Sequence, residues 1–440
     1  MDPRLLKYAE QNAPRYTSYP TAPHFTPAVS SDTFRAWLGE LDIDAKLSLY
    51  IHAPYCRQMC WYCGCNAYAA LRDEPIALYV EALHREIDAV ADALSAREVV
   101  EIHWGGGTPN TLSPERFAGV VAHLRERLDL SNVKRHAVEI DPRLLTNEQA
   151  RAMAEAGVNR VSLGVQDLEP SVQAAIGREQ PFELVRSAVA SLRAAGIDAL
   201  NFDLMYGLPL QTLDTVRRTA QRAASLRPQR FSVFGYAHVP WFKPRQRLID
   251  ETALPDANAR YDLAQAIGET LAAEGYVAVG YDHYALPDDP LASSASLTRN
   301  FQGFVETACD ALVGLGPSAI STLPQGYAQS EPEVGAWRKA VVERGLAIKR
   351  GRELNNEDVW RRELIMRLLC QFEVDLADFG GLCAFVEELE RLRPLALDGL
   401  VKIENGRLRI PAEARPFARL VAQAFDAYAN VGAARHSRAV

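Results

Sequence analysis

The stretch LSLYIHAPYCRQMCWYCGC, residues 47–65, joins a strand signal directly to a run of cysteines. Its first six residues are mostly apolar and β-favouring, so they predict a buried strand. Four of the chain's seven cysteines follow within ten positions, at 56, 60, 63 and 65. A loop so rich in sulfur, at the end of a strand, predicts a bound inorganic group and marks where the rest of the fold converges.

The spacing of Cys56, Cys60 and Cys63 is C-x3-C-x2-C, and it favours an iron–sulfur cluster over zinc. A structural zinc site usually takes two close ligand pairs from two separated loops. Here the remaining cysteines are isolated, at Cys309, Cys370 and Cys383. Three thiolates on one tight loop suit three irons of a [4Fe-4S] cube and leave the fourth iron open for a small molecule. A closed cluster that also uses Cys65, a zinc site and a coincidence of composition are the alternatives.

The composition is that of a globular enzyme with reduced thiols. The chain has 440 residues, of which 48% are hydrophobic and 24% charged, enough for a large catalytic domain and a smaller one. A net charge of −8 argues against nonspecific binding to nucleic acid or an anionic membrane. The sequence contains no run of about eighteen apolar residues and no apolar core of a signal peptide near its start. We therefore expect a cytoplasmic protein whose clustered cysteines bind metal.

Strand-like and helix-like patterns alternate along the first half of the chain. The predicted strands are 47–52, 99–104, 136–140, 160–165, 199–205 and 230–236. Amphipathic segments such as 74–94 and 114–128 lie between them. This alternation predicts an α/β fold with a parallel sheet, and six such units fit a partial (βα)6 TIM-like barrel. The active site of such a barrel lies at the carboxyl ends of its strands, which is where the cysteine loop begins.

The chain is expected to divide into three parts. They are an N-terminal segment that covers the cleft (1–45), the partial barrel with an extension (46–335), and a helical, winged-helix-like C-terminal domain (336–440). Within the last part, GLVKIENGRLRI predicts a hairpin that turns at Asn405-Gly406. An amphipathic helix is expected over 411–428.

A glycine-rich turn and several polar strand ends mark the same edge of the predicted sheet. HWGGGTPNTL (103–112) follows the second strand, and its glycines would let backbone groups approach a ligand closely. The alternative is a tight strand-to-helix turn with no ligand. Polar acceptors end three further strands, at Glu139, Asp141, Gln166, Asp167 and Asp203. Each could equally cap the next helix, but as a set at successive strand ends they favour a binding site.

With Tyr62 just before the third cysteine, the loop reads C-x3-C-x-aromatic-C. This motif resembles the signature of the radical S-adenosylmethionine (SAM) superfamily. The resemblance implies a [4Fe-4S] cluster on Cys56, Cys60 and Cys63 whose open iron binds SAM, which is then cleaved to a 5′-deoxyadenosyl radical. The glycine turn is then expected to hold the methionine part of SAM.

More narrowly, the chain resembles the oxygen-independent coproporphyrinogen III oxidases. Their motifs occur here in order: PRYTSYPTA, SLYIHAPYC, CWYCGC, HWGGGTP, EIDPR, SLGVQD, GREQ, DLMYGLPLQT, YAHVP, DHYALPDDPLA, RNFQG and GLGPSAIS. The likeness runs from near residue 14 to the closing RHSRAV. The N-terminal RYTSYP and Cys65 are similar to the true oxidases, whereas the related haem chaperones typically lack both.

The resemblance implies oxidative decarboxylation of two propionates of coproporphyrinogen III to protoporphyrinogen IX in haem biosynthesis, with one cluster and two SAM molecules. Catalytic roles are expected for Tyr50, Glu139 and Cys65, and Cys65 is not expected to ligate the cluster. The residues expected to bind SAM are Tyr50, Tyr62, Gly105, Gly106, Gly107, Thr108, Glu139, Gln166, Arg178, Asp203, Ala237, Phe301, Gln302 and Ile320, the last three at the second SAM. We further expect a monomer that binds no nucleic acid and takes electrons from a flavodoxin or ferredoxin.

One segment departs from the family pattern. Where the family usually reads RNFQGYTT, this chain reads RNFQGFVET, so Phe304 and Val305 lose hydroxyl groups and Glu306 adds a carboxylate. Beside a propionate, that carboxylate would repel the substrate or have to be protonated. Two other functions therefore stay open: a radical SAM paralogue that methylates or cyclopropanates another molecule, and a haem-binding chaperone. Arginines that could pair with propionates are Arg15, Arg178, Arg245, Arg247 and Arg299.

Overall fold

The computed structural model describes residues 3–294, 297–306, 309–429 and 438. The chain forms two compact units, each assembled from separate stretches of sequence. The sheet unit comprises Phe25–Asp203 and Ala308–Glu353, and the terminal unit comprises Met1–His24, Leu204–Thr307 and Leu354–Val440. One boundary between the two units, after Asp203, falls inside strand β7 (Ala199–Tyr206).

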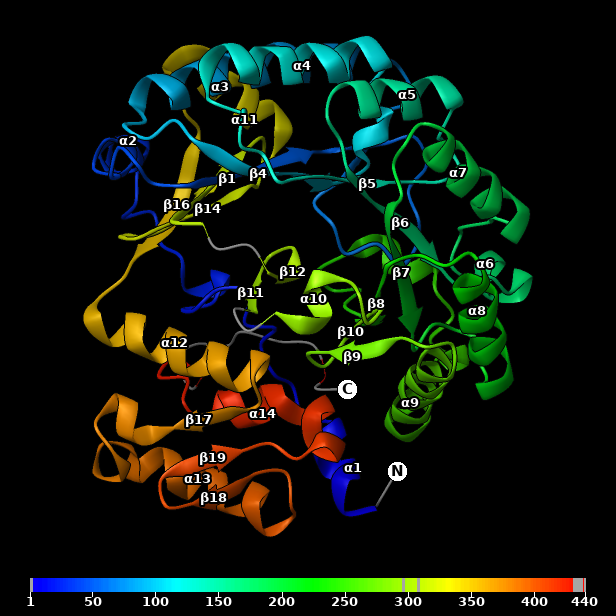
Figure 1. Cartoon of the computed structure of the whole chain (residues 1–440), viewed down its shortest axis with the longest axis vertical. Coiled ribbons are helices and arrows are strands. Elements are labelled where there is room, and N and C mark those ends of the chain that lie inside the picture. Colours follow the sequence, from blue (N-terminus) through cyan, green and yellow to red (C-terminus); the bar gives the residue numbers. More distant parts are fainter. Residues whose placement is uncertain (1–2, 295–296, 307–308, 430–437, 439–440) are drawn as a thin grey trace. The chain divides into compact units, whose positions relative to one another are not determined.

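The sheet unit is built on a mainly parallel sheet that contains the predicted strands (Figure 1). Its strands are β1 (Leu47–Ala53), β4 (Val99–Gly106), β5 (Arg135–Ile140), β6 (Arg160–Gln166), β13 (Ala311–Leu315), β14 (Ile320–Leu323), β15 (Gly326–Ser330) and β16 (Ile348–Glu353). They hydrogen-bond in the order β16-β15-β14-β13-β1-β4-β5-β6. The pairs from β13 to β6 are parallel, and β14, β15 and β16 extend the sheet as antiparallel neighbours. The α/β prediction is confirmed.

Helices lie along the sheet between successive strands, as the alternating pattern predicts (Figure 1). They are α2 (Ser31–Gly39), α3 (Glu74–Ala93), the 3-10 turn η2 (Pro109–Thr111), α4 (Pro114–Arg127), α5 (Asn147–Glu155), α6 (Pro170–Ala175), α7 (Phe182–Ala194) and α11 (Val334–Arg344). In α4, the Ser113 side chain caps the first turn by accepting from the Arg116 N–H, and Pro114 presets the helical backbone. Phe117 and Leu124 lie on its buried stripe.

The C-terminal part of the chain begins later than the sequence predicted. Residues 336–353 group with the sheet unit because α11 packs on α3 and β16 pairs with β15. The polar, half-exposed sequence of β16, IKRGRE, gave no strand signal of its own, since an edge strand need not be apolar on both faces.

In the terminal unit, the last predicted strand is β8 (Arg230–Gly235). It pairs antiparallel with β10 (His283–Ala285), which pairs in turn with β9 (Val277–Val279). The other elements of this part are α8 (Leu213–Ser225), α9 (Ala257–Ala273), α10 (Pro290–Ser293), the hairpin of β11 (Thr298–Asn300) and β12 (Gly303–Val305), and the 3-10 turns η3 (Pro244–Leu248) and η4 (Glu251–Ala253).

The C-terminal region is helical and carries a small antiparallel sheet in the order β17-β19-β18. Its elements are α12 (Asn356–Cys370), β17 (Glu373–Asp375), η5 (Leu376–Phe379), η6 (Leu382–Phe385), α13 (Val386–Leu397), β18 (Lys402–Glu404), β19 (Arg407–Arg409), η7 (Ala412–Phe417) and α14 (Ala418–Gln423). The hairpin turn at Asn405-Gly406 is confirmed, and both residues have positive φ, as a two-residue type I′ turn requires. The single helix expected over 411–428 is wrong. A 3-10 turn containing Pro416 precedes a short α14, because proline cannot donate a backbone hydrogen bond within an α-helix.

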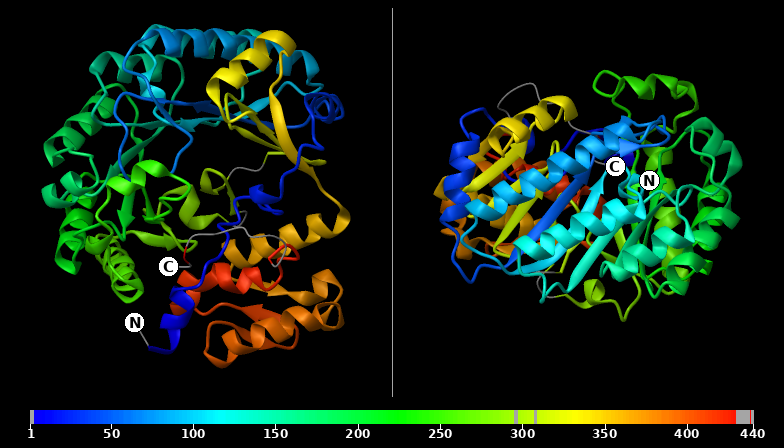
Figure 2. Two further views of the ribbon diagram at one scale, coloured as in Figure 1. Left: turned by 180° about the vertical axis from the view of Figure 1, so that it is seen from behind. Right: turned by 90° about the horizontal axis from the view of Figure 1, so that it is seen from above.

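The N-terminal residues of the terminal unit are ordered against its C-terminal region. Helix α1 (Pro3–Ala9) is followed by the short η1 (Ala22–His24), and the stretch runs beside the C-terminal helices in both figures (Figure 2). Tyr8, Tyr16 and Tyr19 are buried in the same apolar cluster as residues of α12 and α14. The Tyr16 hydroxyl donates to Asp426 Oδ2 at 3.0 Å. Residues 25–45, which we expected to continue this segment, belong to the sheet unit.

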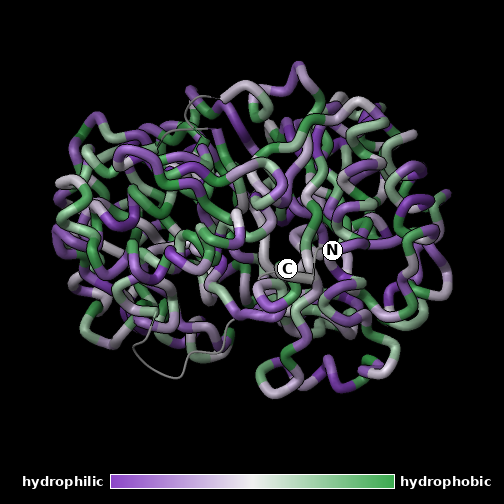
Figure 3. Tube along the Cα trace, turned by 90° about the horizontal axis from the view of Figure 1, so that it is seen from below, coloured by the Kyte–Doolittle hydropathy of each residue, from purple (hydrophilic) through white to green (hydrophobic). Residues whose placement is uncertain are grey.

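Hydrophobic and hydrophilic stretches alternate throughout the trace (Figure 3). Within the described residues, no helix is both long enough and apolar enough to cross a membrane.

Candidate active site

The cysteine loop leaves β1 and is closed at its base by a two-strand contact. β2 (Tyr55–Cys56) pairs with β3 (Tyr68–Ala69), and the Tyr68 and Ala70 N–H groups donate to the carbonyls of Pro54 and Cys56 at 2.8 and 3.0 Å. The closed base holds the loop over the strand end. Cys56 and Cys60 are buried, Cys63 is half-buried and Cys65 is exposed, and all four are free thiols.

All four cysteines of the loop line one cavity of about 190 Å³ within the sheet unit. Eight of the residues predicted to bind SAM also line it: Tyr62, Gly106, Gly107, Thr108, Glu139, Gln166, Arg178 and Asp203. Tyr62 belongs to the cysteine loop, and the others come from the carboxyl ends of β4, β5, β6 and β7 and the segments that follow β4 and β6. These strand ends therefore meet at one cavity, as expected.

The glycine turn packs directly on the cysteine loop. A Cβ at Gly105 would lie 2.9 Å from Glu139 Oε1, one at Gly106 would lie 2.5 Å from the His52 ring, and one at Gly107 would lie 2.9 Å from the Ala53 carbonyl oxygen. The Gly107 N–H donates to that carbonyl at 2.7 Å. Gly106 also has φ +108°, where side chains are rarely tolerated. The glycines are therefore needed for the close approach of turn and loop.

Glu139 is held by a chain of polar and aromatic contacts that runs back to the loop. His103 Nε2 lies 3.0 Å from Glu139 Oε1, and the His103 ring stacks on Tyr50 with centroids 5.9 Å apart. The Tyr50 hydroxyl lies 3.1 Å from His52 Nδ1, and His52 Nε2 lies 2.9 Å from the Asn66 carbonyl. Burial lowers the pKa of His52 and raises that of Tyr50, so both side chains are neutral near pH 7. Tyr50 therefore supports the cavity wall without lining it.

Two guanidinium groups point at the sulfur of Cys60. Arg178 Nη1 donates to Cys60 Sγ at 3.2 Å, and Arg143 Nη2 donates to it at 3.6 Å. Both arginines also pair with Asp141, at 3.4 and 2.6 Å. Burial alone would raise the pKa of Asp141, but the hydrogen bonds from Arg143 and the charge of Arg178 outweigh burial and lower it. This side of the cavity is therefore cationic.

Arg143 was not singled out from the sequence, although it lies in the EIDPR motif. Its position two residues after a strand-end carboxylate was the available signal, since an arginine there can fold back onto that carboxylate.

Gln166 and Asp203 close the remaining wall. Gln166 ends β6 with φ 64°, an uncommon conformation for a residue other than glycine, and its amide lies over Gly164. Asp203 accepts from Ser162 Oγ at 3.1 Å and from Asn201 Nδ2 at 2.8 Å. Sequence reasoning missed Ser162 and Asn201. Asn201 lies two residues before Asp203 in β7, and Ser162 lies four residues before Gln166 in β6. An even spacing places each on the same face of its strand as the predicted acceptor.

Besides Tyr50, five residues predicted to bind SAM do not line the cavity. Ala237, Phe301 and Gln302 belong to the terminal unit, where the Ala237 carbonyl accepts from Gln246 and the Gln302 N–H donates to Asn300. Gly105 packs behind Glu139. Ile320 begins β14 and is half-buried.

The unusual carboxylate of Glu306 has a partner within the terminal unit. Arg230 Nη2 lies 3.0 Å from Glu306 Oε1, and the same guanidinium pairs with Asp289 at 2.6 Å. The Arg230 side chain is 5% exposed, so both ion pairs are shielded from water. Glu306 therefore neutralises a buried arginine, and the expected repulsion of a propionate does not follow from its presence.

The cavity fits an iron–sulfur cube better than a single metal ion. Among the described residues, no three His, Cys, Asp or Glu side chains converge closely enough to hold one ion. A cube spreads its ligands, because each cysteine binds a different iron. The loop offers three or four thiols around one cavity, and two guanidiniums beside a sulfur suit a cluster of net negative charge.

Comparison with known proteins agrees with this geometry. Residues 50–223 match the radical SAM superfamily, and residues 354–417 match the HemN C-terminal domain. The oxygen-independent coproporphyrinogen III oxidase of Bradyrhizobium diazoefficiens is 46% identical over 447 aligned residues, covering 99% of both chains. The chain belongs to the oxygen-independent coproporphyrinogen III oxidase family.

Other family members are similar over nearly the full length. The Escherichia coli (strain K12) oxygen-independent coproporphyrinogen III oxidase is 36% identical, covering 97% of this chain and 95% of its own. The solved structure of the E. coli coproporphyrinogen III oxidase HemN matches with a TM-score of 0.89 at 34% identity, covering 95% of this chain and all of that one. As a radical SAM enzyme of this family, the protein uses a [4Fe-4S] cluster and SAM.

Proposed function

We propose that this protein converts coproporphyrinogen III to protoporphyrinogen IX without oxygen, by decarboxylating two of its propionate side chains. The observation that carries the proposal is the cavity in which four cysteines, a glycine turn and acceptors from successive strand ends meet. Similarity over the whole chain to enzymes of this name supports the choice of substrate.

Cys56, Cys60 and Cys63 would hold the cluster, and Cys65 would stay a free thiol at the same cavity. The closed base of the loop presents these thiols from one short segment. Arg178 and Arg143 would place positive charge beside the sulfur of Cys60. When bound and reduced, the cluster with SAM supplies a carbon radical that removes a hydrogen atom from the substrate.

The cavity walls supply the groups that would bind SAM. Glu139, Gln166 and Asp203 offer oxygen acceptors, which suit an amino group and ribose hydroxyls, and Arg178 could face a carboxylate. The glycine turn would bring backbone groups close to the methionine part. Residues for a second SAM would be Phe301, Gln302 and Ile320, and Ala237 is a further residue expected to bind SAM.

Radical chemistry suits this substrate because a propionate carboxylate cannot leave by acid–base chemistry, since the carbanion would not be stabilised. Removal of a hydrogen atom beside the pyrrole gives a radical delocalised into the ring. Loss of CO2, with transfer of one electron to a separate one-electron acceptor, would then form the vinyl group. The protein's part is to hold the propionate in place and exclude water. Electrons for the cluster would come from a flavodoxin or ferredoxin, and the chain would act as a monomer.

The test is an anaerobic assay of the reconstituted protein with SAM, a strong reductant and coproporphyrinogen III. Mass spectrometry follows 5′-deoxyadenosine and the tetrapyrrole together. We expect loss of two CO2 per tetrapyrrole, abolished by Cys56→Ala and unchanged by Cys383→Ala, which removes an exposed cysteine of the terminal unit.

Other outcomes would redirect the proposal. Deoxyadenosine without decarboxylation would indicate a radical enzyme for another substrate. Neither product from a fully loaded cluster, together with tight haem binding, would indicate a haem-binding chaperone.

A further inference from the structure

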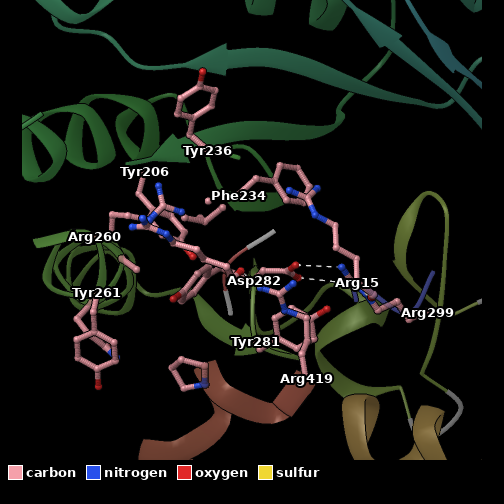
Figure 4. Close-up of a pocket in the computed structure, with 17 residues that line it drawn as sticks. Arg15, Tyr206, Phe234, Tyr236, Arg260, Tyr261, Tyr281, Asp282, Arg299 and Arg419 are labelled. Carbon is pink, nitrogen blue, oxygen red and sulfur yellow. Dashed lines mark hydrogen bonds and ion pairs between the residues drawn. The ribbon is translucent and has the colours of Figure 1, made fainter. Parts of the chain in front are cut away.

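The terminal unit contains a second pocket, of about 100 Å³, that is lined by arginine (Figure 4). The arginine pocket is defined by Arg15 from the segment after α1, Arg260 from α9, Arg299 from β11, Arg419 from α14, and Arg438 near the C-terminus. Segments from both ends and the middle of the chain thus converge on one small volume. In a protein with a net charge of −8, such a concentration of positive charge calls for an explanation.

One carboxylate lines this pocket, and it is already engaged. Asp282 accepts from Arg299 at 3.2 and 3.3 Å and lies 2.6 Å from His283 Nδ1. Burial alone would raise the pKa of Asp282, but Arg299 and His283 outweigh it and lower the pKa far below its ordinary value. The carboxylate is therefore fully ionised and balances one of the five guanidiniums.

Arg15 brings to the pocket a guanidinium that has no hydrogen-bond or ion-pair partner in the described part of the chain. It is accessible to solvent and forms no ion pair there, and its guanidinium donates no hydrogen bond to a described residue. Although the residue reaches solvent, the pocket atoms packed around its guanidinium desolvate it, and together with the nearby charges of Arg419 and Arg299 they lower the pKa of Arg15. A bound anion would offset both the desolvation and the repulsion between these like charges.

The pocket is also preorganised. The Arg419 guanidinium donates to the carbonyls of Ala13 at 3.1 Å and Arg438 at 2.8 Å. Arg299 lies over the Tyr281 ring, 4.7 Å from its centroid, and Arg260 lies 5.6 Å from the centroid of Tyr206. Guanidiniums fixed by stacking and backbone contacts lose little freedom when they bind an anion. Figure 4 shows Arg15, Arg299 and Arg419 around Asp282.

We propose that the arginine pocket binds a propionate carboxylate of the tetrapyrrole, with Arg15 as the residue that recognises it. This inference rests on the proposed function and adds to it a recognition site, within the terminal unit, for one arm of the same substrate. A volume of about 100 Å³ equals roughly three waters' share of the liquid. It admits a carboxylate and its methylene groups but not the macrocycle. The ring therefore stays outside while the arm fixes its orientation.

The test measures binding and does not depend on the cluster. Fluorescence titration of the full chain uses coproporphyrin III, an oxidised tetracarboxylate that does not react, and its tetramethyl ester. We expect the wild-type protein to bind the acid at least tenfold more tightly than the ester. Arg15→Gln should lose about tenfold to a hundredfold in affinity for the acid and nothing for the ester, because a charge-assisted hydrogen bond is lost. Arg15→Lys should recover part of the loss.

The control is Arg393→Gln, which removes one positive charge from an exposed site on α13 in the same unit. It should bind both porphyrins as the wild type does, and thermal unfolding checks that each variant is folded. In turnover, Arg15→Gln should raise KM for coproporphyrinogen III much more than it lowers kcat.

The possible failures are distinguishable. Equal affinity for acid and ester in the wild type, or an Arg15→Gln variant that binds like the wild type, would overturn the pocket assignment and leave the decarboxylation intact. A loss of equal size in Arg393→Gln would also overturn it, because the effect would then be general electrostatics. An Arg15-dependent preference for the acid, with no decarboxylation by the loaded enzyme, would support the pocket and refute the proposed function.

Discussion

Arg178 Nη1 lies 3.2 Å from Sγ of Cys60, although 118 residues separate the two in sequence. The same guanidinium donates to the Gly164 carbonyl at 2.8 Å and to Gln180 Oε1 at 3.1 Å. Its orientation is therefore set by β6 and by the segment that follows α6. A positive charge is held at this sulfur before any cluster binds.

We expect Arg178→Gln to lower the reduction potential of the reconstituted cluster by tens of millivolts. A cationic hydrogen-bond donor at a ligand sulfur stabilises the reduced, more negative state, so its loss makes reduction harder. The measurement is a redox titration followed by electron paramagnetic resonance at equal iron content. Arg143→Gln, whose donor is 3.6 Å from the same sulfur, should shift the potential less. An unchanged potential in a fully loaded Arg178→Gln protein would rule out this electrostatic role.

The buried ion pairs around Arg230 predict an asymmetric response to mutation. Arg230→Met leaves Asp289 and Glu306 without their shared cation, and breaking such a buried pair costs about 3–5 kcal/mol of unfolding free energy. Glu306→Gln keeps a hydrogen-bond acceptor and leaves the Asp289 pair, so it should cost only about 1 kcal/mol. Urea denaturation of the two variants measures both values.

The same pair of variants tests whether Glu306 acts on the substrate. Since its carboxylate faces Arg230, Glu306→Gln should leave KM for coproporphyrinogen III unchanged. A KM that falls severalfold would mean that the carboxylate does repel the propionates.

Glu86 predicts a pH-dependent stability. Burial raises its pKa to about 7 from the ordinary 4.5, although the Gly316 N–H and the Trp337 indole N–H donate to it at 2.6 and 3.0 Å and lower it. Because the folded state holds this proton more tightly than the unfolded chain, the associated stability is complete below pH 4.5. It is lost as the pH rises through 7, by about 3 kcal/mol.

Glu86→Gln removes this titration. Its unfolding free energy relative to the wild type should therefore improve by about 3 kcal/mol between pH 4.5 and pH 8, measured by urea denaturation of the cluster-free protein. Glu81→Gln, at an exposed position on the same helix, should show no such trend. Parallel pH profiles for the wild type and Glu86→Gln would contradict the assignment.

Gly106→Ala should disrupt the contact between the glycine turn and the cysteine loop. The new Cβ would lie 2.5 Å from the His52 ring at φ +108°, so the variant should lose more than about 1 kcal/mol of stability and retain less iron after desalting. The matched control is Gly119→Ala on α4, where the added Cβ would have no neighbouring atom within 4 Å. That change should stabilise the protein by about 0.5–1 kcal/mol. Full iron retention by Gly106→Ala would show that the turn tolerates displacement.

The local features of this protein can be predicted from its amino-acid sequence. Strands β1, β4, β5 and β6 are short β-rich runs bounded by turn signals, so LSLYIH and VVEIHW could be recognised without their neighbours. Strand β13, which pairs parallel with β1, was not predicted. The cysteine loop could also be identified from the sequence, because its thiols lie within ten positions and their spacing alone restricts the group they can bind. Glu139, Gln166 and Asp203 were predicted to lie at one site because parallel strands present their carboxyl ends at one edge of the sheet.

Contacts between charged residues that lie far apart in the sequence could not be predicted, because they depend on how the elements pack. Arg143 and Arg178 reach Cys60 from 83 and 118 residues away, and Glu306 meets Arg230 across 76 residues. The arginine pocket draws on both ends of the chain. A periodic pattern reports which face of an element is buried, but it says nothing about which charged side chain lies opposite. Such pairings depend on long-range packing. Glu306, which departs from the family's sequence pattern, is for this reason explained only by its ion pair with Arg230.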